Sequence, residues 1–318
     1  MVINDEENTK RYDFVKIKDF KYGENPHQKA SLYSYDKEID YDILSENELS
    51  YNGILDLSCA LEIALEFFDV AACIIVKQAN PCAVALSADV ENAFDKALDS
   101  DPISLFASSA AFTRKIELSL AKKLNLMSLS SIVAPDYSDE ALDELKKKKN
   151  LRIVKLNTPL ERILNFQNEE IKLTLFGALV QEKNKISIDI DKFKIVTKTK
   201  PEQEQLEDMI FATKVVKHAK SNAIVVAKNL RTIGICAGQT NRALSVEFAL
   251  HNVCDSPKGS VIASDGAIAT IDNIQIAAQN RVSGIIQPGG SLREKEIIAC
   301  ADKLSVSMVT TGIRHFKH

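Results

Sequence analysis

One stretch in the first third of the chain restricts the possible folds more than any other. Residues 71–76, Ala-Ala-Cys-Ile-Ile-Val, form an apolar run rich in β-branched side chains. Such a run is typical of a strand that is buried on both faces of a sheet. It stops at Lys77-Gln78-Ala79-Asn80-Pro81-Cys82, which is polar and favours a turn. Because open α/β sheets bind ligands at strand ends, Lys77 is a candidate functional residue; the alternative is a surface lysine that closes a strand.

The remainder of the chain alternates between helical and extended patterns. Apolar residues recur at helical spacing over 57–68 and 203–217. This alternation predicts an α/β protein built from two layered α-β-α units. The polar, lysine-rich stretch 182–205 is the best boundary, so we expect a first unit with its connector over 1–200 and a second unit over 201–318. Further strands are expected at 132–134, 173–181, 223–227, 233–236, 261–265, 284–287 and 305–309, and further helices at 92–98, 140–149, 245–250 and 294–304.

Composition and charge exclude several classes of protein. The net charge is -4, whereas a nucleic-acid-binding protein is expected to be basic overall or to carry a basic face. Residues 1–10 are polar and acidic, so no signal peptide is expected, and no uncharged apolar run approaches the ~18 residues of a membrane span. We therefore expect a cytoplasmic protein without nucleic-acid or membrane partners. Reduced thiols are expected at the six cysteines, none of which forms a C-x-x-C pair: Cys59, Cys73, Cys82, Cys236, Cys254 and Cys300.

Two polar segments carry groups that can contact a ligand. Residues 20–28 combine a cation, a phenol, an imidazole and amides, and functional groups concentrate on such loops. Residues 237–242, Ala-Gly-Gln-Thr-Asn-Arg, place a glycine turn beside amide, hydroxyl and guanidinium groups. Such groups can hold a phosphate or a carboxylate. Ordinary structural turns are the alternative at both places.

Short motifs spread along the whole chain follow the order of one protein family. They are Tyr22–Gln28, Leu49–Asn52, Val76–Lys77 with Asn80–Cys82, Asp101–Ser104, Lys214–His218 with Lys220–Ile224, Ala237–Gln239, Ile285–Ser291 and Thr311–His318. Each motif alone is weak, but the ordered set is highly specific. On these motifs, the chain resembles the AICAR transformylase domain of the bifunctional purine-biosynthesis protein.

The resemblance implies a fold, an assembly and a reaction. Two cytidine-deaminase-like subdomains without zinc are expected, in an intertwined homodimer with active sites between subunits. The cyclohydrolase half that precedes this domain in the family is expected to be absent. The family transfers a formyl group from 10-formyltetrahydrofolate to the 5-amino group of AICAR, a nucleoside monophosphate. A structural monovalent cation is also expected.

The resemblance also implies roles for individual residues. Lys77 would assist the folate leaving group and the developing oxyanion, and Asn222 would align the two reactants. Gln78 occupies the position of the family's proton-transferring histidine. Other positions match binding residues of the family: Lys21, Tyr22, Gln239 and Arg314 for the nucleotide, with Arg314 on its phosphate, and Asp272 and Pro288 for the folate.

Several positions depart from the family pattern. Gln78 can form hydrogen bonds but cannot act as a base near neutral pH. Lys21 replaces an arginine and keeps the charge without the bidentate fork. Ala107-Ser108 replaces a glycine pair, and Ser130 stands where a carboxylate is expected. The aromatic wall beside the folate is replaced by Ala267-Ile268-Ala269-Thr270.

These departures leave three functions open. The first is an AICAR transformylase with a variant pocket, in which the substrate carboxamide carries the proton. The second is a relative that transfers a formyl or another one-carbon group to a different amine. The third is a non-catalytic nucleotide-binding homologue that acts as a regulatory or partner subunit. The retained Lys77, Asn222, Gln239 and Arg314 favour a pocket for an anionic nucleotide in all three.

Overall fold

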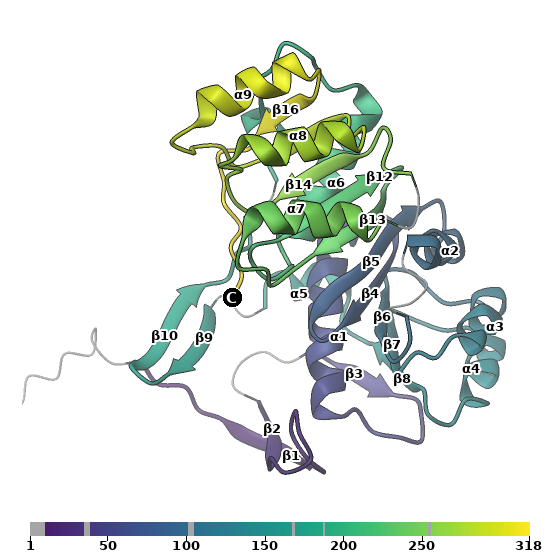
Figure 1. Cartoon of the computed structure of the whole chain (residues 1–318). Coiled ribbons are helices and arrows are strands. Elements are labelled where there is room, and N and C mark those ends of the chain that lie inside the picture. Colours follow the sequence, from purple (N-terminus) through teal and green to yellow (C-terminus); the bar gives the residue numbers. More distant parts are fainter. Residues whose placement is uncertain (1–9, 35–38, 101–104, 167–168, 187, 254–255) are drawn as a thin grey trace, which may run out of the picture.

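The computed structural model describes residues 10–34, 39–100, 105–166, 169–186, 188–253 and 256–318 (Figure 1). Within these residues, strands from both halves of the chain form one mixed sheet of 12 strands. The first half contributes β3 (Tyr41–Ile43), β4 (Ala71–Lys77), β5 (Asn80–Ser87), β6 (Ser109–Phe112), β7 (Ser131–Ala134) and β8 (Arg152–Leu156). The second half contributes β11 (Lys194–Ile195), β12 (Ile224–Lys228), β13 (Arg231–Cys236), β14 (Val261–Ser264), β15 (Gly284–Gln287) and β16 (Ser307–Thr310).

The two halves of the sheet have the same topology. The first half runs β3-β8-β7-β6-β4-β5 and the second runs β11-β16-β15-β14-β12-β13. In each half an antiparallel hairpin, β4–β5 or β12–β13, lies next to three parallel strands, β6-β7-β8 or β14-β15-β16. The halves join where β5 pairs antiparallel with β13, at Ala85 and Arg231. The sequence predicted two α-β-α units but not that their sheets are continuous.

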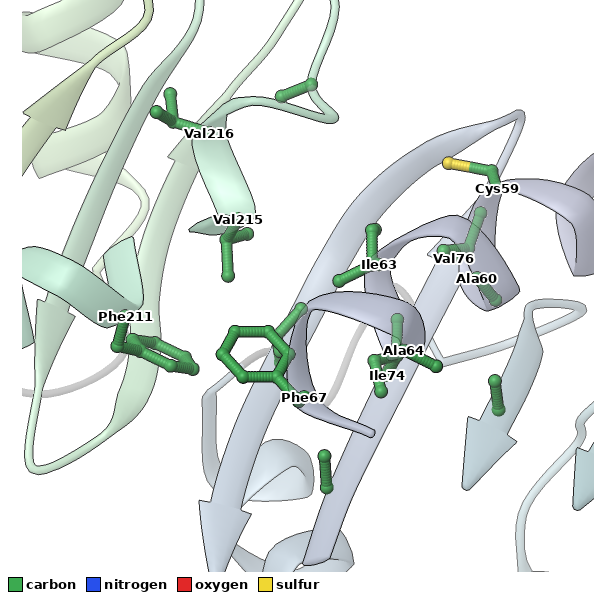
Figure 2. Close-up of a cluster of buried hydrophobic side chains, with 14 of the residues drawn as sticks. Cys59, Ala60, Ile63, Ala64, Phe67, Ile74, Val76, Phe211, Val215 and Val216 are labelled. Carbon is green, nitrogen blue, oxygen red and sulfur yellow. The ribbon is translucent and has the colours of Figure 1, made fainter. Parts of the chain in front are cut away.

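Helices cover both faces of this sheet. One face carries α1 (Tyr51–Ala64) with the 3-10 turn η2 (Leu65–Phe67), and α6 (Gln203–Val216). The rings of Phe67 and Phe211 meet at 5.5 Å between these two helices (Figure 2), so the halves share one core. The opposite face carries α2 (Val90–Ser100), α3 (Leu118–Leu126) and α4 (Asp139–Lys146) in the first half, and α7 (Arg242–His251), α8 (Ile271–Gln279) and α9 (Glu294–Lys303) in the second.

Strand β4 confirms the prediction of a strand buried on both faces. Residues 71–76 are all buried. Ala72, Ile74 and Val76 belong to the core beneath α1 and α6, whereas Cys73 and Ile75 belong to the core beneath α2–α4. Each fully buried aliphatic side chain contributes about 1.5–3 kcal/mol, so the run places β4 in the interior of the sheet.

Two hairpins extend from the body on the side of the C-terminus (Figure 1). They are β1 (Val15–Phe20) with β2 (Ala30–Ser34), and β9 (Glu169–Thr174) with β10 (Gly177–Glu182). The single strand predicted at 173–181 is therefore wrong. The chain reverses at residues 175–176, where the Thr174 hydroxyl accepts a hydrogen bond from the Phe176 N–H at 3.1 Å and Gly177 has φ of +134°.

Helix α1 begins earlier than its apolar periodicity indicated. The expected start was residue 57, but the helix begins at Tyr51. The Ser50 hydroxyl caps it by accepting a hydrogen bond from the Gly53 N–H at 3.0 Å. Such N-caps stabilise a helix by ~1 kcal/mol. The extra turns bring Asn52 and Asp56 onto the helix.

The described residues can be compared with the expectations for cysteines, membrane spans and metal sites. Cys59, Cys73, Cys236 and Cys300 are free thiols, and the Cys82 thiol donates to the Asn80 carbonyl at 3.9 Å, while Cys254 and the motif at 101–104 lie outside the described residues. Across the described ranges, no helix is long and apolar enough to cross a membrane. In the same part of the chain, no cluster of three or more His, Cys, Asp or Glu side chains is arranged to hold a metal ion.

Candidate functional site

One edge of the sheet gathers most of the residues singled out from the sequence. The hairpin β4–β5 turns there, between Lys77 and Asn80. Because β5 and β13 are antiparallel, the start of β12 and the ends of β13–β16 lie on the same edge. We call this the site edge. Lys77 and Gln78 thus lie on the same edge as Asn222 and Gln239.

The β4–β5 turn has an unusual backbone conformation. Gln78 and Ala79 have φ of +52° and +53°, which non-glycine residues rarely adopt. The Ala79 N–H donates to the Asp56 carboxylate of α1 at 2.7 Å, and the Cys59 thiol donates to the Ala79 carbonyl at 3.4 Å. Helix α1 therefore holds the turn that follows Lys77. Gln78 is exposed at its tip and Lys77 is half-buried.

A second contact links this turn to the other half of the chain. The Asn80 side-chain oxygen accepts a hydrogen bond from the Lys220 backbone N–H at 3.3 Å. Lys220 lies two residues before Asn222. The structure therefore brings Lys77–Asn80 and the Asn222 segment together within one chain.

Arg242 is the centre of a polar cluster in the second half. Its guanidinium donates to the Asn222 side-chain oxygen at 2.6 Å, to the Ser264 hydroxyl at 2.9 Å and to the fully buried Asp265 carboxylate. The Asn222 amide group donates in turn to the carbonyls of Gln239 and Thr240, at 3.0 and 3.1 Å. Asn222 therefore orders the loop that carries Gln239.

Sequence reasoning noticed Arg242 only as the last residue of a glycine turn. The signal that could have found its partner is Asp265, a carboxylate two residues after the apolar run Val261–Ala263. Buried carboxylates require a charged or hydrogen-bonding partner. Gly266 is needed for close packing here, because a Cβ at this position would lie 2.5 Å from both the Arg242 guanidinium and the Phe316 ring.

The C-terminal segment, residues 311–318, completes the site edge. The Arg314 guanidinium lies over the Phe316 ring at 4.3 Å, and Arg242 approaches the same ring at 5.7 Å. The His315 backbone N–H donates to the Asp265 carbonyl at 2.9 Å. Arg314 is exposed, so its charge is accessible to an anionic ligand.

One half-buried ion pair anchors this segment to α1, and a buried polar cluster links η2 to the end of α6. Glu62 pairs with Lys317 at 2.9 Å, and Glu66 pairs with Lys217 at 2.7 Å and with His218 at 3.0 Å. Burial alone would raise the pKa of Glu66, but the hydrogen bonds and charges of His218 and Lys217 outweigh it and lower the pKa to about 2. Glu66 therefore stays ionised at neutral pH.

The His315 side chain is buried, within electrostatic range of Lys217 and Glu66. Burial, reinforced by the Lys217 charge, lowers the pKa of its imidazole to about 4. Its Nδ1 lies 3.0 Å from the Asn184 side-chain nitrogen. Because Asn184 can donate this hydrogen bond to a neutral imidazole, the contact suits the unprotonated form.

Lys21 and Tyr22 lie on a different element. Both are exposed on the loop after β1. The Phe20 ring meets Tyr51 edge-on at 5.8 Å, and the Asn52 amide donates to the Glu24 carbonyl at 3.3 Å. The loop therefore contacts the first turn of α1, the helix that holds the β4–β5 turn.

Asp272 and Pro288 follow the ends of neighbouring strands on the site edge. Asp272 is exposed in the first turn of α8, and the Pro288 carbonyl accepts a hydrogen bond from the Gly312 N–H at 2.9 Å. Between β14 and α8, Ile268 is buried and donates its N–H to the Gln287 side chain at 2.6 Å. Aliphatic or small side chains, at residues 267–270, thus occupy the positions of the expected aromatic wall.

The remaining positions that differ from the family pattern also lie on the site edge. Ala107 and Ser108 precede β6, which begins next to the end of β4, and Ser130 precedes β7, which begins next to the start of β6. Ala107 has φ of +59°, the conformation that favours the glycine expected there. The Ser130 hydroxyl donates to the Ser108 carbonyl at 3.2 Å, so this serine serves the local backbone.

Comparisons with known proteins identify the family of this chain. The family model "AICARFT/IMPCHase bienzyme" matches residues 2–252. Proteins named bifunctional purine biosynthesis protein PurH from Caldicellulosiruptor bescii, Thermoanaerobacter sp. and Aquifex aeolicus are 44%, 43% and 39% identical over 305, 311 and 311 residues. These matches cover 94%, 96% and 95% of this chain, but 58%, 60% and 60% of the relatives.

Solved structures add little to these matches. Reduced HcgD from Methanocaldococcus jannaschii aligns over 64% of this chain and 72% of its own, with 11% identity and a TM-score of 0.16, which is too low to compare folds. The family model covers most of the chain, and the relatives share about four residues in ten with it. The chain therefore belongs to the AICARFT/IMPCHase bienzyme family.

Proposed function

We propose that the protein transfers a formyl group from 10-formyltetrahydrofolate to the 5-amino group of AICAR. The observation that carries this proposal is the contact between Asn80 and Lys220, which joins the Lys77 turn to the Asn222–Arg242 cluster on one edge. Family membership supports the choice of reaction. The proposal concerns the part of the relatives that this chain spans.

The chemistry of the transfer fits the groups on the site edge. The acceptor amine attacks the formyl carbon, the bond from that carbon to the folate N10 breaks, the amine loses a proton and N10 gains one. The Lys77 ammonium can stabilise the oxyanion and assist the leaving nitrogen. Gln78 can orient the substrate by hydrogen bonds, and the substrate carboxamide would carry the proton in place of the family histidine.

Binding roles follow from exposure and charge. Arg314 would take the nucleotide phosphate, supported by its exposed guanidinium beside Phe316. Lys21 and Tyr22 would contact the nucleotide from the loop at the start of α1, and Gln239 from the loop that Asn222 orders. Asp272 and Pro288 would contact the folate from the ends of β14 and β15.

The monovalent cation expected from the family needs oxygen ligands. The fully buried Asp265 carboxylate is the strongest such ligand on the site edge, but the Arg242 guanidinium and the Ser221 hydroxyl engage its two oxygens. A carboxylate that is already neutralised does not fit a further cation. No step of the formyl transfer is assigned to a monovalent cation.

The proposed reaction is tested with the purified chain, AICAR and 10-formyltetrahydrofolate. Formation of formyl-AICAR together with an equal amount of tetrahydrofolate is the expected result. Binding of AICAR by calorimetry, with no product over the uncatalysed rate, would contradict the proposal and favour the non-catalytic nucleotide-binding homologue.

A second candidate is formyl transfer to a different amine. The small residues at Ala267, Ala269 and Thr270, where an aromatic wall is expected, favour a reshaped pocket. Consumption of 10-formyltetrahydrofolate with another aminoimidazole or amine, but not with AICAR, would select this candidate.

We also propose a homodimer with sites completed between subunits. Leu173, Leu175, Phe176 and Leu179 are strongly exposed on the hairpin β9–β10 that extends from the body (Figure 1). Such apolar patches mark interaction surfaces. A monomer at micromolar concentration in light scattering would reject the dimer.

The proposed subdomains correspond to the repeated halves of the sheet. The repetition of strand order supports two cytidine-deaminase-like subdomains, divided within the connector that precedes residue 201. In the pairing pattern, β11 belongs with the second half because Lys194 and Ile195 pair with β16. The division would then precede β11. Limited proteolysis near residue 190 that releases two folded fragments would support it.

A further inference from the structure

The β4–β5 turn accepts support from a carboxylate, that of Asp56, which the proposed chemistry does not use. A two-residue hairpin turn with both φ values positive is normally formed by Asn-Gly or similar sequences. Here it is formed by Gln78 and Ala79, neither of which favours this conformation. The Asp56 carboxylate accepts the Ala79 N–H at 2.7 Å and supplies the compensating interaction.

The second half of the chain repeats this device. The β12–β13 turn consists of Asn229 and Leu230, both with φ of +56°. The Asp208 carboxylate of α6 accepts their N–H groups at 2.9 and 2.7 Å. Asp56 in α1 and Asp208 in α6 are each the sixth residue of their helix. In both halves, therefore, an aspartate of the covering helix holds a strained hairpin turn.

Only the first of these turns presents residues assigned to the reaction. Lys77 directly precedes Gln78, so the backbone of the turn fixes the direction in which both side chains leave it. Two further hydrogen bonds contact the same turn. The Cys59 thiol donates to the Ala79 carbonyl, and the Lys220 N–H donates to the Asn80 side-chain oxygen. A misplacement of about 1 Å can cost a reaction ~10²-fold in rate.

We propose that Asp56 is a positioning residue for formyl transfer, which holds Lys77 and Gln78 in place by fixing the Gln78-Ala79 turn through the Ala79 N–H. The inference rests on the proposed function for its catalytic consequence. Asp56 itself neither touches the reactants nor exchanges a proton with them. Its carboxylate acts on the backbone alone.

The test compares four variants of the full chain. Asp56→Ala removes the acceptor, and the expected result is a kcat about 10²-fold lower with KM for AICAR changed less than about threefold. Asp56→Asn keeps an oxygen acceptor and should retain most of kcat. Asp56→Ala combined with Ala79→Gly should recover kcat to within about tenfold, because glycine adopts the turn without support. Asp208→Ala, the matched control, should lower the Tm and leave kcat unchanged.

Hydrogen exchange at the Ala79 amide gives a readout that does not need activity. Exchange should accelerate at least about tenfold in Asp56→Ala and stay unchanged in Asp208→Ala, since only the first variant removes its acceptor. An inactive wild-type chain would refute the proposed function, while the exchange result would still decide whether Asp56 fixes the turn. Unchanged exchange would overturn that role.

Two kinetic results would also overturn the proposal. An unchanged kcat in Asp56→Ala would show that the turn does not need its support for transfer. A lowered kcat that Ala79→Gly fails to restore would show that Asp56 acts on the reactants directly. If Asp56→Ala does not fold, the double variant supplies the comparison, because glycine at position 79 removes the backbone strain that the carboxylate offsets.

Discussion

Lys77 and Lys228 occupy equivalent places in the two halves of the protein. Each ends the first strand of a central hairpin and precedes a turn with two positive φ values. Their surroundings differ. The turn after Lys77 contacts the Lys220 segment on the site edge. On the opposite edge, the turn after Lys228 contacts β5, where the Leu230 carbonyl accepts the Leu86 N–H at 2.9 Å.

The segments that follow the last parallel strand of each half differ in the same way. After β16, residues 311–318 reach Asp265 and the Glu62 side chain of α1. After β8, Asn157 and Thr158 bond back to Asp40, close to β3. The same framework therefore carries polar side-chain contacts of the C-terminal segment in one half, and backbone hydrogen bonds at the equivalent place in the other. A repeated fold does not imply a repeated site.

The strongest expected difference between the halves concerns the two lysines. Lys77→Ala should lower formyl transfer by more than about 10³-fold, because a positioned acid and an oxyanion contact are lost together. Lys228→Ala, the matched control, should leave transfer unchanged, since Lys228 donates to the Lys258 carbonyl at 2.9 Å, away from the site edge. Steady-state kinetics of the two variants decide the point. Equal losses would mean that the halves are not functionally distinct.

A gain of activity is expected from the residue after Lys77. Gln78→His would restore a group that can transfer a proton near neutral pH, and should raise transfer to AICAR by about 10²–10⁴-fold, or roughly 3–5 kcal/mol in the barrier. Asn229→His, at the equivalent position, should have no effect. Single-turnover rates with both substrates measure the change. If Gln78→His binds AICAR and remains at background, the reshaped folate pocket limits the reaction instead.

Part of this fold is predictable because it depends on local sequence. Residues 71–76 form a buried strand because they are continuously apolar, and 203–217 form a helix because their apolar residues recur at helical spacing. Strand β5 was missed because Asn80-Pro81-Cys82 favours a turn; pairing with β4 and β13 extends it from Asn80 to Ser87. β4 is adjacent to β5 in the sequence, but β13 is far from it.

The sequence predicted which residues belong to the candidate site better than it predicted the contacts between them. The motifs singled out Lys77, Asn222 and Arg314 individually. The Arg242–Asp265 ion pair joins the first residue of α7 to the loop after β14, and no periodicity in the sequence indicates it. The support of Ala79 by Asp56 depends on where α1 packs on the sheet. Neither interaction is encoded by adjacent residues, so both had to come from the structure.

Acid should destabilise the site edge, where residues 311–318 lie, before it destabilises the region around β8. Burial lowers the pKa of His315 from 6.5 to about 4, so the folded state binds fewer protons than the unfolded chain between these values. Neutral His315 therefore supports the folded state fully above about pH 6.5. As the pH falls from 6.5 towards 4, the free energy of unfolding decreases by up to about 3 kcal/mol. The neighbouring titratable groups whose charges act on the His315 imidazole are Lys217, Glu66, His218 and Asp265.

Urea unfolding of wild type and His315→Gln between pH 8 and pH 5 measures this contribution. The variant should lose less stability than wild type over the interval. The pKa of Glu66 is lowered to about 2, so its contribution is lost only as the pH falls below about 4.5, outside the interval. Parallel profiles for the two proteins would contradict a buried, neutral His315. Hydrogen exchange should show the acid-induced opening first in residues 311–318, rather than around β8.

The smallest expected effect lies at the seam between the halves. Arg231 pairs with Asp99 at 3.6 Å across the junction of β13 with the first half, and the Asp99 side chain is 72% exposed. An exposed ion pair contributes only ~0–1 kcal/mol, because water and salt screen it. Asp99→Asn should therefore change the free energy of unfolding by less than about 0.5 kcal/mol, whereas Phe211→Ala, in the shared core between α1 and α6, should cost about 3–5 kcal/mol. Chemical denaturation compares the two directly. If Asp99→Asn separates the halves into two unfolding transitions while Phe211→Ala does not, polar pairing at the seam, and not the shared core, joins the halves.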